Sequence, residues 1–120
     1  MEREKDIEAY LVHSVKELGG VAFKFVSPGH AGVPARLECL PGGLAWFVEL
    51  KAPGKKTRLL QDVEIRKLRE LGFRVFVADS REQADEMLNW ARSAYDSWQA
   101  SIREIKSRMP VQWEGGSNGL

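Results

Sequence analysis

The sequence contains a single cysteine, Cys39, and no apolar run long enough to cross a membrane. One thiol excludes an internal disulfide and a cysteine-based zinc site, so we expect a reducing, cytoplasmic setting. A membrane-spanning helix needs about 18 or more consecutive apolar residues, and no membrane partner is expected. The opening residues, MEREKDIEAYLVHSV, mix both signs of charge and lack the apolar core of a signal peptide.

A strong charge imbalance is also missing. The 18 basic and 17 acidic residues leave a formal net charge of +1, which by itself gives no reason to expect nucleic acid as a partner. With 120 residues, of which 43% are hydrophobic, the chain fits one compact domain. We expect this domain over residues 1–110, followed by a small, polar and flexible tail over residues 111–120.

The spacing of apolar residues predicts helices that alternate with strands. Helices are expected over residues 2–18, from 57 or 60 to 71, and over 81–108, and strands over 21–26, 33–40, 44–50 and 73–78. Pro41-Gly42-Gly43 joins two strands as a hairpin, and the next helix lets the last two strands lie parallel. The predicted fold class is α/β, a mixed sheet of about four strands flanked by helices in the order α-β-β-β-α-β-α.

Glu49 and Lys51 are two positions apart at the end of the most hydrophobic predicted strand. Because side chains alternate along a strand, both leave the same face of the sheet. Taken alone, Glu-x-Lys is a common tripeptide, and a solvated strand end is the favoured interpretation. The surrounding residues therefore decide between a structural and a chemical role.

Three further motifs lie around this pair. Gly32-Val33-Pro34-Ala35 opens the preceding strand, Pro41-Gly42-Gly43 forms the turn, and Leu60-Gln61 opens the following helix. Over residues 2–79 the chain resembles the virus-type replication-repair nuclease (VRR-Nuc) family of the PD-(D/E)xK superfamily, whose motif runs Gly-x-Pro-Asp, a glycine turn, a strand ending in Glu-x-Lys, and a helix with a glutamine. The resemblance implies a restriction-endonuclease-like core and a metal-dependent endonuclease that hydrolyses DNA phosphodiester bonds.

The resemblance assigns a role to each matching position. Glu49 and the carbonyl of Leu50 become metal ligands, and Lys51 becomes the group that orients or activates water and steadies the phosphate. Gln61 holds the site from its helix, and Glu8 is the acidic residue that family members bring from the first helix. The cation is Mg²⁺ or Mn²⁺, because phosphodiester hydrolysis uses a hard cation with oxygen ligands. Two alternatives stay open: Glu8 as a solvated helix residue, and Gln61 as a helix start.

Ala35 departs from the family pattern, which places an aspartate metal ligand directly after the proline. Alanine cannot coordinate a cation, so we expect weakened metal binding and cleavage reduced by orders of magnitude. Glu38 does not replace the missing ligand on a regular strand, since residues 35 and 38 point to opposite faces. Two origins of Ala35 are open: an engineered inactivating substitution, which the otherwise intact motif favours, or a natural, degenerate member of the family.

Four basic residues without an acid among them follow the strand: Lys51, Lys55, Lys56 and Arg58. Such a cluster is usually a solvated loop, but beside Glu-x-Lys it predicts a phosphate-binding surface whose affinity weakens with salt. His30, in the loop before the second strand, is a further candidate phosphate contact. His13 has no partner at metal-site spacing and is expected on a helix surface.

The last predicted helix carries one apolar stripe: Met87, Trp90, Ala94, Trp98, Ile102, Ile105 and Met109. About 28 helical residues extend about 40 Å, longer than a small domain needs. We therefore expect a homodimer contact, and stand-alone members of the resembled family are dimers. The same resemblance implies structured or branched DNA, such as Holliday junctions, as the substrate, in a phage or bacterial intracellular setting.

Two other functions are compatible with the sequence. A nuclease-fold module could bind DNA or a partner while Ala35 keeps it catalytically silent. A general α/β interaction domain with an accidental Glu-x-Lys would leave the co-occurrence of the glycine-proline motif, the turn and Gln61 unexplained. Divalent metal distinguishes the nuclease from the silent module, because only a nuclease restored by Ala35→Asp would cleave DNA when Mg²⁺ or Mn²⁺ is added.

Overall fold

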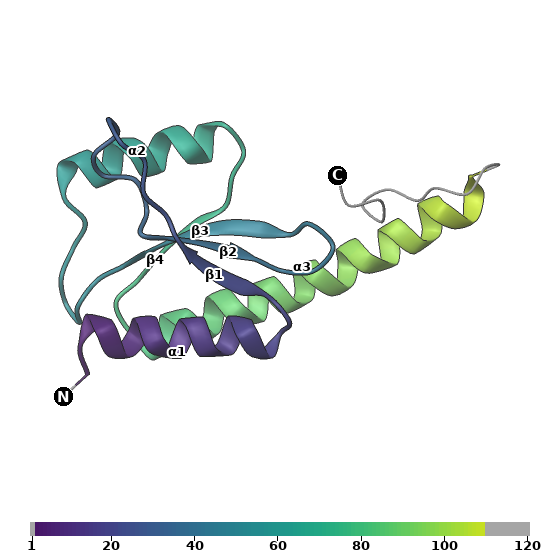
Figure 1. The fold of residues 1–120 in the computed structure, drawn as a ribbon, viewed down its shortest axis with the longest axis horizontal. Helices are drawn as coiled ribbons and strands as arrows, with labels where there is room; N and C mark the ends of the chain where they lie inside the picture. The colour runs from purple at the N-terminus through teal and green to yellow at the C-terminus, as the bar shows by residue number, and fades with distance from the viewer. Residues whose placement is uncertain (1, 110–120) are drawn as a thin grey trace.

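A computed structural model describes residues 2–109 as a four-stranded sheet with helices on both faces (Figure 1). The elements in chain order are α1 (Glu4–Glu17), β1 (Val21–Lys24), β2 (Arg36–Cys39), β3 (Ala45–Leu50), α2 (Leu59–Glu70), β4 (Val75–Ala78) and α3 (Arg81–Arg108). Helices α1 and α3 cover one face of the sheet and α2 covers the other. The predicted order and fold class are confirmed.

The sheet has the strand order β1-β2-β3-β4. Strands β1, β2 and β3 pair antiparallel, and β3 pairs parallel with β4 after the α2 crossover, as predicted. The first two strands are shorter than their apolar patterns indicate. The Phe25 N–H still donates to the Ala35 carbonyl at 2.8 Å, but Pro34 has no N–H for the ladder, which ends regular pairing there.

Two apolar clusters lie on the two faces of the sheet. The larger one joins α1 and α3 to the sheet through Ile7, Leu11, Val15, Leu40, Trp46, Val48, Leu50, Ala78, Met87, Leu88 and Ala91. The smaller one packs Ile65 of α2 against Phe47 and Val75. The α2 side is therefore the thinner layer, and in it α2 packs against β3 and β4.

Helix α3 has the length that its sequence predicts. The Gln83 N–H donates to Ser80 Oγ at 3.1 Å at the helix start, and the Asp79 N–H donates to Gln83 Oε1 at 2.8 Å. The C-terminal half of α3 projects beyond the sheet (Figure 1), with Trp98 Nε1 donating to the Gly42 carbonyl at 2.7 Å. The predicted stop at Pro110 and the tail lie outside the described residues.

No helix within residues 2–109 is both long and apolar enough to cross a membrane.

Candidate active site

Glu49 lies near the end of β3, on the sheet face that α2 covers. Phe47, two positions earlier, packs with Ile65 of α2, and strand alternation directs Glu49 to the same side. Glu49 is only 5% exposed. The Ala35 N–H donates to its Oε1 at 3.0 Å, and Gln61 Nε2 donates to its Oε2 at 3.0 Å. The carboxyl is therefore held between Ala35, directly before β2, and the first turn of α2.

Lys51 lies beside this carboxyl. Its Nζ is 3.5 Å from Glu49 Oε2, and its backbone N–H donates to the Ala78 carbonyl at 2.9 Å. The second bond keeps the chain extended one residue beyond β3, so the two side chains leave one face together. An acid and an amine therefore meet at the carboxyl end of the central strand, with the lysine nearer to solvent.

Gln61 contacts both the helix start and the site. Its Oε1 accepts from the Arg58 N–H at 2.8 Å while its amide nitrogen donates to Glu49. Gly32 allows the loop before β2 to lie against this turn. A Cβ at Gly32, where φ is +92°, would stand 2.6 Å from the Leu60 carbonyl oxygen. Gln61 therefore takes part in the capping box at the start of α2 and also contacts Glu49, and its role in the site stays a prediction.

The ionisation of Glu49 reflects its burial. Burial raises the pKa of this carboxyl above its usual range, and the nearby charge of Glu4 raises the same pKa further. The ammonium of Lys51 and the Ala35 N–H lower it. A divalent cation would act in the direction of Lys51, because positive charge favours the ionised carboxylate.

Ala35 and Glu38 lie on different sides of the sheet. Ala35 presents its N–H to Glu49 on the α2 side. Glu38 pairs in register with Trp46, whose ring belongs to the cluster under α1 and α3. Glu38 is fully buried, so it does not supply the carboxylate that Ala35 lacks.

Glu4 and Glu8, two of the acidic residues of α1, have different surroundings. Glu8 accepts from Arg36 Nε at 3.1 Å, and it is not among the described residues that line the pocket around Lys51. Glu4 lines that pocket and raises the pKa of Glu49. The sequence could not choose between them, because residues four apart share one helix face. The tertiary contacts separate the two, since Glu8 pairs with Arg36 and Glu4 lines the pocket.

The four predicted basic phosphate contacts, Lys51, Lys55, Lys56 and Arg58, border one pocket, whereas His30 is not among the described residues that line it. The pocket measures about 320 Å³ and is lined by Glu4, Lys51, Ala52, Lys55, Lys56 and Arg58. The Gly54 N–H donates to Asp79 Oδ2 at 3.2 Å, which ties this loop to the end of β4. His30 is exposed in the loop before β2, with its Nδ1 3.4 Å from Ser27 Oγ. The basic loop therefore shares a pocket with Lys51, and the buried Glu49 carboxyl lies behind that lysine, outside the pocket lining.

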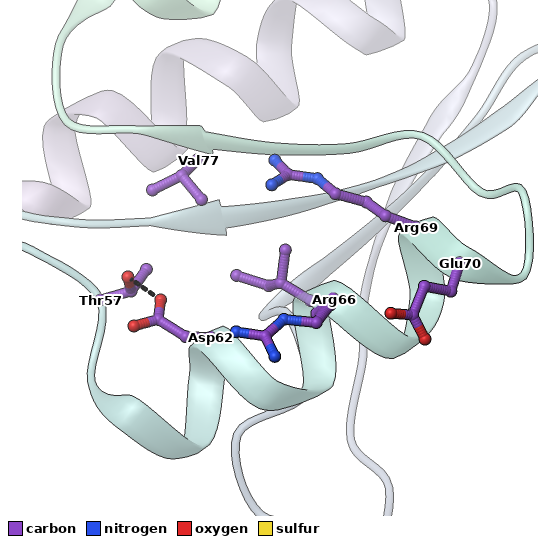
Figure 2. A pocket seen from close by; sticks show the side chains of 7 residues that line it. Thr57, Asp62, Arg66, Arg69, Glu70 and Val77 are labelled. Carbon is purple, nitrogen blue, oxygen red and sulfur yellow. Dashed lines mark hydrogen bonds between the residues drawn. The ribbon is translucent and has the colours of Figure 1, made fainter.

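A second pocket of about 520 Å³ lies between α2 and β4 (Figure 2). Its charged lining consists of Asp62, Arg66, Arg69 and Glu70, with Thr57 bonded to Asp62. The Arg69 guanidinium donates to the Val75 carbonyl at 2.7 Å. Acids balance the arginines here, so this pocket is a poorer anion site than the basic loop.

Two comparisons relate the chain to known proteins. The chain is 51% identical over 80 residues to the protein named "Putative nuclease p44" of Acyrthosiphon pisum secondary endosymbiont phage 1, covering 67% of this chain and 86% of that relative. A solved structure of a VRR_NUC domain matches with a TM-score of 0.69 and 32% identity, over 74% of this chain and 97% of that one. No family model matches the sequence. The chain belongs to the VRR-Nuc family.

The VRR-Nuc membership confirms the family that the motifs indicate, and it argues against an accidental Glu-x-Lys. The metal-ligand set of this VRR-Nuc chain is short of carboxylates. Among residues 2–109, no group of three or more His, Cys, Asp or Glu side chains is placed to hold a metal ion. Glu49 and the Leu50 carbonyl are oxygen donors, and Mg²⁺ accepts one or two carboxylates with water and substrate oxygens completing its shell. The donor chemistry therefore fits a divalent cation, with one carboxylate fewer than an aspartate at position 35 would give.

Proposed function

We propose that the chain is a nuclease domain that hydrolyses DNA phosphodiester bonds with a divalent cation, and that Ala35 impairs its cleavage. One observation carries this proposal. In a VRR-Nuc fold, the Glu49 carboxyl and the Lys51 ammonium lie 3.5 Å apart at the end of the central strand, beside a pocket lined by basic residues. This arrangement suits chemistry on a phosphate, where negative charge must be both held and neutralised.

The proposed cation, Mg²⁺ or Mn²⁺, is held by Glu49 and the Leu50 carbonyl, with Glu4, whose charge acts on Glu49, as a further carboxylate. Bound there, the cation would polarise the phosphate and lower the pKa of a water. Pro34 leaves the carbonyl available. The register that pairs Arg36 with Val48 sets Pro34 opposite Leu50, and a proline has no N–H to donate to that carbonyl.

The other residues of the site position the reacting groups and neutralise the charge of the phosphate. Lys51 neutralises phosphate charge and orients the attacking water, from a place 3.5 Å from Glu49. Gln61 fixes the orientation of the Glu49 carboxyl through its amide. Glu8 acts through structure, since its pair with Arg36 ties α1 to β2 and so fixes the first turn that carries Glu4.

The proposed substrate is structured or branched DNA, and the proposed assembly is a homodimer. Lys55, Lys56 and Arg58 supply sequence-independent phosphate contacts, and His30 is a further candidate contact. The projecting half of α3 offers an apolar stripe to a second copy. Two sites in one dimer suit paired incisions across a four-way junction.

A catalytically silent DNA-binding module is the alternative function. Ala35 favours it, because this position gives only a main-chain N–H to Glu49, and both carboxyl oxygens of Glu49 are already hydrogen-bonded within the chain. In this case the basic loop binds DNA and the site does no chemistry.

Restoring the aspartate tests the proposal. We expect Ala35→Asp to tighten Mn²⁺ binding about 10- to 100-fold, measured by calorimetry, because ligand-sphere changes have effects of this size. Cleavage of a labelled four-way junction in millimolar Mg²⁺ or Mn²⁺ should rise by about 100-fold or more. The gain follows from a second charged oxygen ligand on the α2 side of the sheet.

Two matched variants interpret the result. Ala35→Asn has the shape of aspartate without its charge and should stay near the activity of the present chain. Ala35→Asp combined with Lys51→Met should bind metal but cleave poorly. If Ala35→Asp binds metal and DNA yet produces no cleavage, the silent module is the better description. Unchanged metal affinity would contradict the ligand assignment itself.

A further inference from the structure

Three apolar side chains stand exposed at the start of α2. Leu59 is 79% exposed, Leu60 is 59% exposed and Val63 is 37% exposed. The buried side of the helix lies elsewhere, at Ile65, which packs against the sheet. Leu59 and Val63 are four residues apart and share one face of the helix. The exposed leucines are therefore not the edge of the core but a separate apolar projection, which we call the Leu59–Val63 ridge.

Positive charge lies at the N-terminal end of the ridge, whereas the charges at its other end are balanced. Arg58, directly before it, lines the basic pocket with Lys51, Lys55 and Lys56. Arg66, one turn beyond Val63, lines the pocket between α2 and β4 (Figure 2). Nearby acids are engaged locally, since Asp62 accepts from Thr57 and Glu64 pairs with Lys67. An occupant that carries negative charge beside an apolar surface is therefore complementary to the ridge and the adjoining basic pocket.

Nucleic acid presents this combination, with phosphates outside and base faces between them. In an intact duplex the base faces are stacked, and apolar side chains reach them only by opening a base step. Where a duplex is nicked, branched or bulged, bases are already unstacked and the energy of opening is lower. We propose that the Leu59–Val63 ridge packs against unstacked bases and so directs the site to interrupted duplexes. This inference rests on the proposed function and names the feature of DNA that is recognised.

The position of the ridge relates this contact to cleavage. Gln61 lies within the same helical turn and donates to Glu49. Leu59 and Leu60 directly precede Gln61 in the chain. Bases that pack against these leucines would therefore lie close to the groups proposed to act on the phosphate. The ridge would select where along a strand the backbone enters the basic pocket.

The test measures binding by the present chain without divalent metal. Affinity is compared for an intact duplex and for the same duplex carrying a branch or a few unpaired nucleotides. We expect a preference for the interrupted duplex of about tenfold, because burial of one leucine corresponds to at least a factor of this size. The double variant Leu59→Ser, Leu60→Ser should reduce this ratio to about one while changing binding to intact duplex by less than about threefold.

Leu71→Ser is the matched control, since Leu71 is 73% exposed at the other end of α2, and it should keep the preference. A 2-aminopurine base at the interruption should brighten on binding to the native chain and not to the double variant. An unchanged ratio in the double variant, or no preference in the native chain, overturns the inference while leaving DNA binding intact. No binding to any DNA overturns the proposed function as well. A change of molecular mass in the double variant would assign the ridge to a contact between copies and also overturn it.

Discussion

The carboxyl of Glu49 is the proposed cation ligand, and its ionisation depends on its surroundings. Burial raises its pKa, and the hydrogen bond from Ala35 and the charge of Lys51 oppose that rise. Because metal binding needs the ionised form, affinity at this site should fall as pH drops through the raised pKa. Besides its proposed contact with phosphate, Lys51 lowers the pKa of Glu49 and so widens the pH range in which this carboxyl is ionised.

Glu38 is the other unusual carboxyl of the chain. Both of its oxygens, like Trp46 Nε1, are buried without a hydrogen-bond partner within the described residues. Burial raises the pKa of Glu38 to about 8, with Arg36 lowering it and Glu8 raising it. At neutral pH this side chain is therefore protonated in the folded protein and ionised in the unfolded chain.

The stability of the fold should depend on Glu38 and on pH. Between about pH 4.5 and about 8 the folded state binds a proton that the unfolded state has lost, so the free energy of unfolding falls as pH rises, by at most about 1.4 kcal/mol per pH unit. Glu38→Gln removes this loss and should stabilise the protein most at pH 8 and above. Urea unfolding followed by circular dichroism from pH 5 to 9 measures both.

An exposed glutamate provides the comparison for that experiment. Glu86→Gln on the solvent side of α3 removes one carboxyl of the same kind and should leave the pH slope of the native chain unchanged. Parallel pH slopes for the native chain and Glu38→Gln would show that Glu38 is solvated or paired in the folded protein.

The loop between β1 and β2 and the first turn of α2 form one packed unit. Gly32 brings the loop against the Leu60 carbonyl, and one residue later Gln61 holds Glu49. The glycine of the family motif is thus required by a close approach of two backbones. Gly32 therefore affects the site because it lacks a Cβ where the loop contacts α2.

Gly32→Ala should loosen this unit. The substitution combines a positive φ with a Cβ 2.6 Å from a backbone oxygen, and we expect a loss of stability of about 2–4 kcal/mol. Gly29→Ala in the same loop is the control, since its φ is +83° but a Cβ would meet nothing within 4 Å. Thermal unfolding should place Gly29→Ala between the native chain and Gly32→Ala. Equal losses for the two would mean that the loop moves freely away from α2.

The whole molecule is extended by α3, with principal extents of 53 × 32 × 23 Å. The turn at Gly42 supports the middle of the projecting half through Trp98. Beyond this contact, Trp98 and Ile105 remain 45% and 48% exposed on one side of the helix. Apolar exposure along a projecting helix is the surface that a second copy would cover in the proposed homodimer.

Light scattering measures this assembly directly. The native chain should have twice the mass of one copy, and Ile105→Lys should give a single copy because it places a charge within the apolar stripe. Ala100→Lys, on the opposite and exposed side of α3, should keep the double mass. A single-copy mass for the native chain would contradict the proposed homodimer.

The sequence by itself determined the elements, their order and the family. Apolar periodicity located each helix and strand, the Pro41-Gly42-Gly43 turn gave the hairpin, and the long helix between Arg81 and Arg108 was predicted at its observed bounds. These features are local, because spacing along the chain decides which side of a helix or strand is apolar. The proximity of Glu49 and Lys51 follows from the same alternation.

Only the tertiary structure decided what surrounds that pair. Glu4 and Glu8 share one helix face, and the packing of α1 across the sheet brings Glu4 to the pocket while Arg36 engages Glu8. The burial of Glu38 and the approach of Gly32 to α2 likewise depend on how distant segments pack. Such contacts join residues far apart in the chain, and no local spacing encodes the angle at which two elements meet.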